Sequence, residues 1–302
     1  MSKVDLHIHS IKSSDGELTV SGILGMCKTA GMKLVSITDH NSVQGTCEAL
    51  EIVKKGNITK PAVLSGVELD SSYKGRFFHI LGYGFDASRR EYSEIEKDIL
   101  NQEKTASKER IHLFQKTTGI PLDTKAILDA ANGGIVAGEL IGEHAMAWEN
   151  AATSDVLKPY RPGGEKSDMP FVRIYWDFFA RGKPAYIPVE FISLPDAIKL
   201  IHDTGGIAVL AHPGQNIEGD FNLLDDIIAE GIDGIEVYSS YHTPSEAARF
   251  LDIARQKKLL VSCGSDFHGK TKPNIPLGGH GSLLDDEDII NSFHLKLAQF
   301  AG

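Results

Sequence analysis

The 302 residues include 31 basic and 41 acidic side chains, which gives a formal net charge of −10, and 41% of the residues are hydrophobic. This apolar content is ordinary for a folded globular protein of this length, so a largely disordered chain is excluded. The acidic balance repels polyanions and argues against duplex nucleic acid as a partner, whereas local positive charge can still hold a small anion.

The three cysteines, Cys27, Cys47 and Cys263, are far apart and show no CxxC spacing, which argues against a disulfide framework and against a thiolate zinc site. No stretch approaches the roughly 18 apolar residues of a membrane span, and the first residues lack the apolar core of a signal peptide. We therefore expect a cytoplasmic protein with no membrane partner.

Short apolar segments rich in β-branched residues recur along the chain and predict strands. Helical patterns lie between most of them, and this alternation predicts βα units with parallel strands. The predicted strands are residues 4–9, 34–38, 62–69, 77–83, 206–211, 234–238 and 259–264.

Two of the helical patterns carry clear start and stop signals. In SLPDAIKLIHDTGG, Ser193 is placed to cap the helix, Pro195 stands in the first turn and Gly205 ends it. In TPSEAARFLDIARQKK, Thr243 and Glu246 have the spacing of a capping box. Both patterns predict well-defined helices between strands.

The stretch from about residue 91 to residue 180 breaks the βα rhythm with a long charged helical pattern, shorter helical patterns and no convincing strand before Tyr186. We predict an α/β barrel domain that carries the metal site, formed by residues 1–90 and 185–302. Residues 91–184 are predicted to form an inserted, mainly helical cap or substrate domain. The alternative is a plain spacer on the far side of the barrel.

Histidines and carboxylates stand at the ends of the predicted strands. His7 and His9 alternate along the first strand, so their side chains project from the same face. The carboxyl ends of parallel barrel strands meet on one face, where so many polar groups would be costly to bury without metal ions. The nine candidate metal ligands are His7, His9, Asp15, His40, Glu68, His79, His212, Asp266 and His268.

Nine donors exceed the four to six that one ion takes, so two or three divalent ions are expected. Nitrogen and oxygen donors without sulfur favour Mn, Fe or Zn, and Glu68 and Asp266 are the natural bridging carboxylates. Three divalent ions balanced by Asp15, Glu68 and Asp266 leave a surplus of about +3, which favours hydroxide and an anionic substrate. Metal hydroxide attack on a phosphate ester is therefore the predicted reaction.

The chain then shows, in order, DLHIHS with SDGE, ITDHNSVQG, GVELD, FHILGYG, GGIAVLAHPG and SCGSDFHG. These motifs resemble those of the PHP family, named for polymerase and histidinol phosphatase domains, over nearly the whole length. The resemblance implies a distorted seven-stranded (β/α) barrel with a trinuclear metal centre. It also implies a metal-dependent phosphatase or phosphodiesterase.

The resemblance also assigns the ligands. It places His7, His9, Glu68 and Asp266 around one ion and Asp15, His40 and the bridging Glu68 around a second, with His79, His212 and His268 completing the cluster. Asp15 stands where some members have histidine, and we count it among the catalytic candidates. This difference resembles the branch that cleaves nucleotide 3'-phosphates or cyclic sugar phosphates.

Within that branch, the nucleotide phosphatases are expected to carry an Arg-Pro-His-like motif early in the insertion. The nearest sequence here, VAGELIGEHAMAW, has Glu143 and His144 but no arginine. This departure favours a cyclic sugar phosphate over a nucleoside 3',5'-bisphosphate as the substrate, with phosphate as a product.

The segment YRPGGEKSDMPFVRIYWDFFARGKPAYIP is similar to a stretch of relatives whose cap lies over the metals. Arginine binds phosphate oxygens in pairs and lysine adds a point charge, so its cations are candidate substrate contacts; each could instead be a solvated surface cation. The candidates are Arg161, Lys166, Arg173, Arg181 and Lys183.

Tyr238, Tyr241 and His242 follow a predicted strand, in EVYSSYHT, and are expected near the mouth of the barrel. His242 is a candidate to protonate the leaving oxygen, and a solvated loop histidine is the alternative.

Three other functions stay open at this point. An amidohydrolase-like C–N hydrolase also begins with HxH, but it normally needs a carboxylated lysine or a differently placed histidine pair. A nuclease acting from an RNA end is disfavoured by the acidic charge. A non-catalytic, metal-stabilised PHP module would tolerate the loss of ligands, whereas all nine positions are filled here.

Overall fold

The computed structural model describes residues 2–13, 15–56, 58, 60–131 and 134–300. By their internal contacts these residues form two compact units. The first contains the chain up to Glu96, Phe191–Gly269 and the chain from Asn274 onward; the second contains Lys97–Glu190 and Lys270–Pro273. The hypothesis that the second unit is a substrate-binding cap remains a prediction.

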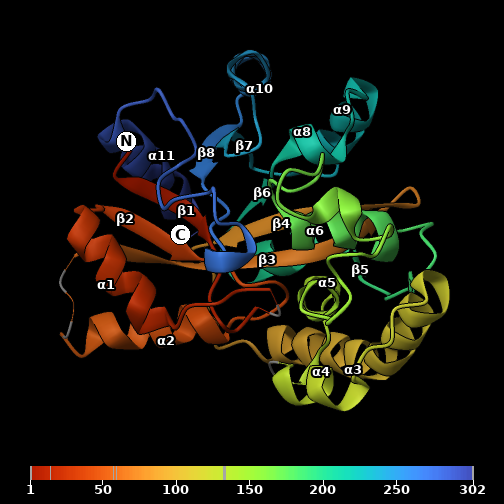
Figure 1. The fold of residues 1–302 in the computed structure, drawn as a ribbon. Coiled ribbons are helices and arrows are strands. Elements are labelled where there is room, and N and C mark those ends of the chain that lie inside the picture. The colour runs from red at the N-terminus through yellow and green to blue at the C-terminus, as the bar shows by residue number, and fades with distance from the viewer. Residues whose placement is uncertain (1, 14, 57, 59, 132–133, 301–302) are drawn as a thin grey trace. The chain divides into compact units, whose positions relative to one another are not determined.

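The strands of the first unit lie in one curved sheet (Figure 1). They are β1 Val4–Ile8, β2 Leu34–Ile37, β3 Ala62–Tyr73, β4 Arg76–Tyr83, β5 Ile192–Ser193, β6 Ile207–Leu210, β7 Gly234–Ser239 and β8 Leu260–Gly264. The path through the sheet is β1-β2-β3-β4-β6-β7-β8, and the short β5 pairs with β3 beside this path. The predicted strands are thus confirmed.

The two ends of the path meet, so the sheet is a nearly closed seven-stranded barrel. After β8, the N–H of Asp266 donates to the carbonyl of His7 at 2.8 Å, and the N–H of His9 donates to the carbonyl of Phe267 at 2.9 Å. This confirms the predicted barrel. It also brings the first motif of the chain against the last.

The predicted parallel βα pattern does not extend to β4, which runs antiparallel to both β3 and β6. A short turn at Lys74 and Gly75, both with positive φ, folds β4 back on β3 as a hairpin. Because β4 runs the other way, His79 lies in the first half of its strand, opposite Asp70. The hairpin therefore brings His79 to the end of the barrel where β3 carries Glu68.

Helices pack around the barrel in the first unit, with α2 against β2 and β3, α7 against β3, β4 and β6, and α10 against β7 and β8. The helices of this unit are α1 Val20–Ala30, α2 Gln44–Lys54, α7 Leu194–Asp203, α8 Pro213–Asn216, α9 Phe221–Ala229, α10 Pro244–Lys257 and α11 Asp286–Ala298.

The predicted helix signals are confirmed where the structure tests them. The Ser193 hydroxyl accepts from the N–H of Asp196 at the start of α7, and Gly205 follows the helix with φ of 83°. At the start of α10, Thr243 and Glu246 form both bonds of the capping box. Local sequence therefore sets where these helices begin.

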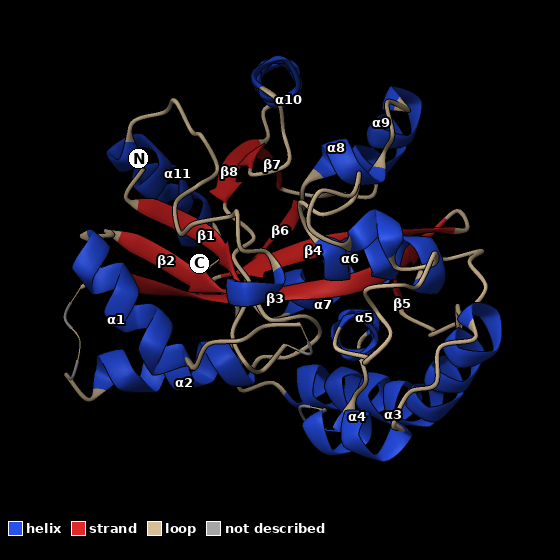
Figure 2. Cartoon of the chain, in the orientation of Figure 1, coloured by secondary structure: helices blue, strands red, loops and turns tan. Residues whose placement is uncertain are grey.

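The second unit is mainly helical in its described residues (Figure 2). The long α3, Arg90–Thr118, begins in the first unit and is followed by α4 Thr124–Ala130, α5 Gly138–Met146 and α6 Pro170–Ile174, with a π-helical turn at Tyr175–Phe179. These helices share an apolar core of their own that includes Phe114, Ile127, Ile141 and Ile174. Among the residues that the structure describes, no helix has both the length and the apolar character needed to cross a membrane.

Candidate metal centre

The barrel gathers the nine predicted ligands at one end, and eight of them form three overlapping groups. Within each group the potential ligand atoms lie within 4.8 Å of one another. The groups are His7, His9, Glu68 and Asp266; His9, Asp15, His40 and His268; and His40, Glu68 and His79. His212 joins the cluster through Glu68, because its Nε2 lies 3.2 Å from Glu68 Oε1.

Glu68, on β3, lies at the centre of the cluster and is fully buried. Its Oε2 atom lies 3.0 Å from Nε2 of both His7 and His9. Its Oε1 atom lies 2.8 Å from Nδ1 of His79 and 3.2 Å from Nε2 of His212. One carboxylate thus contacts imidazoles from β1, β4 and the segment after β6, as a bridging ligand would.

Asp266 closes the first group from the other side. Its Oδ1 atom lies 3.0 Å from Nε2 of His9 and 3.4 Å from Nε2 of His7. Its Oδ2 atom accepts a hydrogen bond from the Tyr241 hydroxyl at 2.5 Å. Asp266 itself adopts a positive φ of 57°, so its backbone is held in the left-handed region to present the carboxylate. Tyr241 lies at the mouth of the barrel, as its sequence position predicted.

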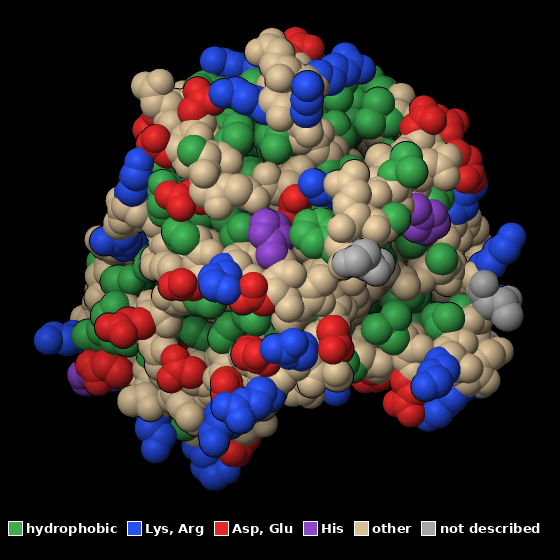
Figure 3. All heavy atoms as spheres, turned by 180° about the vertical axis from the view of Figure 1, so that it is seen from behind, with side chains coloured by type: hydrophobic (Ala, Val, Ile, Leu, Met, Phe, Trp, Pro, Cys, Tyr) green, Lys and Arg blue, Asp and Glu red, His purple; other side chains and the backbone are tan. Residues whose placement is uncertain are grey.

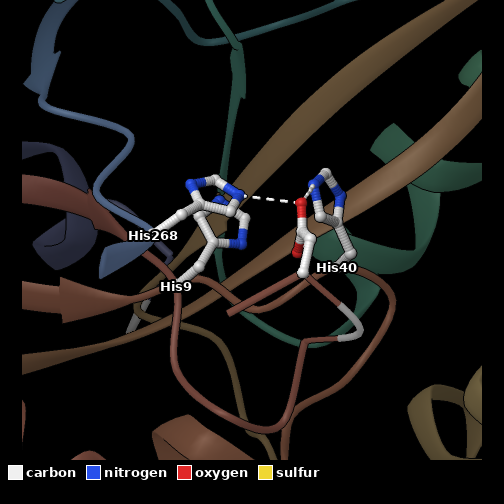
Figure 4. A group of neighbouring side chains, drawn as sticks. His9, His40 and His268 are labelled. Carbon is white, nitrogen blue, oxygen red and sulfur yellow. Dashed lines mark ion pairs between the residues drawn. The ribbon is translucent and has the colours of Figure 1, made fainter. Parts of the chain in front are cut away.

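The second group is drawn in Figure 4, where the rings of His9 and His268 lie one over the other and face His40. The centroids of the first two rings are 4.0 Å apart with an interplanar angle of 23°. Nε2 of His268 lies 2.9 Å from Oδ2 of Asp15, and Nε2 of His40 lies 3.9 Å from the same oxygen. Asp15 therefore lies among imidazoles, as predicted for a ligand.

The hydrogen bonds of His268 test whether a cation fits this group. Its Nδ1 donates to the carbonyl of Asp266 at 2.9 Å, so the neutral ring carries its proton there. Nε2 then directs a lone pair toward Asp15, and two acceptors 2.9 Å apart attract each other only through a proton or a metal ion. The donor set is imidazole and carboxylate, which suits divalent transition metals.

A buried nitrogen of His212 gives a second test. His212 is 6% exposed, and its Nδ1 has no hydrogen-bond partner among the residues that the structure describes. An uncompensated polar atom in a buried site is costly, and a bound ion compensates such groups. The clusters are consistent with several divalent metal ions.

The electrostatics show how strongly the cluster attracts positive charge. Burial alone would raise the pKa of Glu68, yet His7, His40, His79 and His212 hold it well below 4.5. Burial likewise opposes protonation of His7, but the surrounding carboxylates raise its pKa well above 6.5. The pKa of Asp15 is also well below 3.8, against its burial, because His268 lies beside it. The carboxylates therefore stay ionised where metal ligands must be ionised.

Two acidic residues at this end of the barrel were missed by the sequence analysis. Asp70 lies 3.0 Å from Nδ1 of His40 and accepts from the Asn41 side chain at 2.7 Å. Glu236 on β7 is fully buried and contacts both His7 and the backbone of His212. The available signals were a charge inside the apolar strand GIEVYS and a second carboxylate two positions after Glu68.

His242 has backbone partners at both ring nitrogens. Nδ1 donates to the carbonyl of Val237 at 2.9 Å, and Nε2 accepts from the N–H of Gly214 at 3.0 Å. A β-carbon at Gly214 would lie 2.7 Å from the ring, so glycine permits the close approach. These bonds tie His242 to the turn that follows His212, and its assignment as a general acid remains a prediction.

The predicted substrate-binding cations belong to the second unit. Arg161 donates to the carbonyl of Ser154 at 2.7 Å, and Lys166 lies 2.6 Å from the Asp177 carboxylate. Arg173 pairs with Asp168 at 2.8 Å, and the side chains of Arg173, Arg181 and Lys183 are all exposed. Their contact with a substrate stays a prediction.

Comparison with known proteins supplies the family. Residues 5–137 match the model of the PHP domain. A 3',5'-nucleoside bisphosphate phosphatase of Chromobacterium violaceum is 30% identical over 275 residues, which cover 89% of this chain and 88% of the relative. A phosphoribosyl 1,2-cyclic phosphate 1,2-diphosphodiesterase of Eggerthella lenta is 28% identical over 88% of this chain and 94% of its own.

A 5'-3' exoribonuclease of Haemophilus influenzae is as similar, at 28% identity over 88% of this chain and 90% of its own. Among solved structures, a putative metal-dependent phosphoesterase of Bifidobacterium adolescentis superposes with a TM-score of 0.74 at 24% identity, over 97% of this chain and 96% of the other. That structure supports the fold. With the imidazole and carboxylate clusters in place, the chain belongs to the PHP-domain family of metal-dependent phosphoesterases.

Proposed function

We propose that this protein hydrolyses a small phosphorylated metabolite at the cluster centred on Glu68, with a cyclic sugar phosphate as the first candidate. The observation that carries the proposal is the position of Glu68, whose two oxygens contact imidazoles of His7, His9, His79 and His212. The nine clustered residues would hold two or three divalent ions, for which Mn, Fe and Zn all suit the donors.

Divalent ions at this site would activate water near neutral pH and neutralise the oxygens of a phosphoryl group. The protein's own residues would keep the ligands ionised and oriented. Tyr241 holds one oxygen of Asp266, which leaves the other directed at His7 and His9. The exposed Arg181 and Lys183 are proposed to bind a phosphate of the substrate.

The preference for a small substrate has three supports. The relatives include a cyclic phosphate diphosphodiesterase and a bisphosphate phosphatase. The net charge of −10 disfavours long polyanions. Acidic and basic side chains are also interspersed over the face drawn in Figure 3, unlike the continuous basic groove that follows a nucleic acid backbone.

A second candidate is hydrolysis from the 5' end of RNA. It is favoured by one observation, the exoribonuclease of H. influenzae, whose identity to this chain equals that of the cyclic phosphate enzyme. Both reactions would use the same cluster, so substrate comparison separates them.

The test is phosphate release by Mn²⁺-loaded protein from a ribose 1,2-cyclic phosphate bearing a 5-phosphate, a nucleoside 3',5'-bisphosphate and a 5'-phosphorylated RNA oligonucleotide. We expect the highest kcat/KM with the cyclic sugar phosphate. A higher value with the bisphosphate or with RNA would reassign the substrate, and no release from any of the three by metal-loaded protein would overturn the proposal.

A further inference from the structure

Glu236 occupies a central place in the barrel without belonging to any of the ligand groups. It lies on β7, is fully buried, and places its two oxygens on two different partners. Oε1 lies 2.9 Å from Nδ1 of His7, and Oε2 accepts the backbone N–H of His212 at 2.8 Å. One carboxylate therefore joins a ligand of β1 to the turn that presents the ligand after β6.

The direction of these bonds is fixed by chemistry. A peptide N–H can only donate, and an ionised carboxylate can only accept. His7 must therefore carry a proton at Nδ1 to hydrogen-bond to Glu236. In the neutral ring that a metal ligand requires, Nε2 then carries the lone pair, 3.0 Å from Glu68 Oε2 and 3.4 Å from Asp266 Oδ1.

The packing leaves the pair little freedom. A β-carbon added at Gly264 would lie 2.1 Å from Cβ of His7 and 2.7 Å from Oε1 of Glu236, so β8 approaches both side chains as closely as glycine allows. His7 itself is fully buried. Burial and the close approach of β8 to Cβ of His7 therefore restrict movement of the side chain.

We propose that Glu236 is a positioning residue that sets the tautomer of His7 and thereby keeps the His7 Nε2 lone pair available to a metal ion. This inference rests on the proposed function, because it assumes that the cluster binds metal. Removing the charge of Glu236 should weaken metal binding although no ligand is removed.

Glu236→Gln is the informative variant. The amide oxygen of the glutamine must face the N–H of His212, because an amide NH₂ group there would place two hydrogen-bond donors against each other. The NH₂ group then faces Nδ1 of His7, which has to accept, and the ring proton moves to Nε2, where it blocks metal. We expect about 10- to 100-fold weaker Zn²⁺ affinity, the usual loss when the partner of a ligating histidine is changed.

Asp233→Asn is the matched control. Asp233 is another carboxylate that joins a histidine to a backbone amide, since its Oδ2 lies 2.7 Å from Nε2 of His202 and accepts from the N–H of Ala208 at 2.9 Å. It precedes β7, at the opposite end of that strand from the cluster. The Zn²⁺ affinity of Asp233→Asn should stay within about twofold of the wild-type value, because Asp233 contacts no candidate metal ligand.

Zn²⁺ binding is measured by equilibrium dialysis of the full-length chain, and ¹⁵N NMR of the histidine rings in the zinc-loaded wild type reports the tautomer directly. We expect Nδ1 of His7 to carry a proton and Nε2 to carry none. We also expect Glu236→Gln to lower Zn²⁺ affinity when it is made in the wild-type protein but not when it is made in His7→Ala. A proton on Nε2 in the wild type, or equal losses in both backgrounds, would overturn the inference. The NMR measurement decides even if Glu236→Gln fails to fold.

The two proposals fail in different ways. A wild-type protein that binds no Zn²⁺ contradicts the proposed function. If the wild type binds Zn²⁺ and Glu236→Gln binds it equally tightly, only the role of Glu236 is contradicted.

Discussion

The Nε2 atoms of His7 and His9 lie 3.1 Å apart, and each lies 3.0 Å from the same oxygen of Glu68. A shared cation would stabilise two imidazole nitrogens that lie so close to each other and to one carboxylate oxygen. Alternation along β1 puts both rings on one face, and the β3–β4 hairpin supplies the carboxylate.

Glu68→Gln should abolish most of the activity. The amide lacks the negative charge that faces four imidazoles and offers one acceptor oxygen in place of two. We expect a loss in kcat/KM of about 1000-fold or more, equivalent to about 4 kcal/mol, with reduced metal content. Glu287→Gln, at an exposed carboxylate paired with Lys33, is the control and should leave both unchanged. Full metal content with unchanged activity in Glu68→Gln would contradict the assignment.

Gly264→Ala should disturb the centre without changing any polar group. Its β-carbon would overlap Cβ of His7, at 2.1 Å, so β1 or β8 must move. We expect at least about a 10-fold loss of metal affinity, as for other changes beside a ligand, measured by dialysis. Gly25→Ala is the control because a β-carbon there meets nothing within 4 Å. In the middle of α1 it should raise stability by about 0.5–1 kcal/mol.

His242→Ala separates a positioning role from proton donation. Both ring nitrogens are engaged by backbone groups, so we expect a loss in kcat of about 10-fold that is the same for aryl and alkyl phosphate substrates. A general acid would instead show a much larger loss with the alkyl leaving group, which needs the proton. His112→Ala, at an exposed position of α3, is the control.

Lys183→Ala tests the predicted phosphate contact. Lys183 is exposed, whereas the ammonium of Lys166 is already neutralised by Asp177 at 2.6 Å. We therefore expect Lys183→Ala to raise KM by about 10-fold, a loss of about 1.4 kcal/mol, and Lys166→Ala to raise it less. Steady-state kinetics with the phosphorylated substrate provide the measurement, and Lys125→Ala on α4 is the control. An unchanged KM in Lys183→Ala would remove this residue from the substrate site.

Asp233 should contribute to stability in a pH-dependent way. Burial would raise its pKa, but bonds from His202, the Ala208 N–H and Lys296 hold the pKa below 3.8. A depressed pKa stabilises the folded state above pH 3.8, and this contribution is lost as the pH falls through the folded-state value. We expect Asp233→Asn to lower the free energy of unfolding by about 1–3 kcal/mol at pH 7.

Urea denaturation of the wild type and Asp233→Asn at several pH values measures this contribution. The difference between the two proteins should shrink as the pH is lowered through about 4 toward 2, because the wild-type carboxylate becomes protonated. A difference that stays constant over that range would contradict the assignment. Asp203→Asn, at an exposed carboxylate paired with Lys199, is the control.

The sequence alone determined the features that depend on local pattern. Short apolar segments rich in β-branched residues predicted the strands, and caps such as Ser193 and the Thr243–Glu246 box placed helix starts correctly. The nine candidate ligands could be named because so many histidines and carboxylates at one end of a barrel would be costly to bury without metal ions, and the tertiary structure gathers all of them. The strand and helix predictions needed only residues a few positions apart, whereas the ligand prediction also needed strand ends to meet at one end of the barrel.

Only the tertiary structure decided how these parts meet. The antiparallel course of β4 depends on strand pairing over the whole sheet, and a βα rhythm gives no sign of it. Glu236 lies 229 positions from His7, and its role depends on a contact at 2.9 Å and on the direction of one proton. Hydrogen-bond direction and close approach between distant strands arise when the barrel closes, which is why the sequence named the candidate ligands but not Glu236, which contacts two of them.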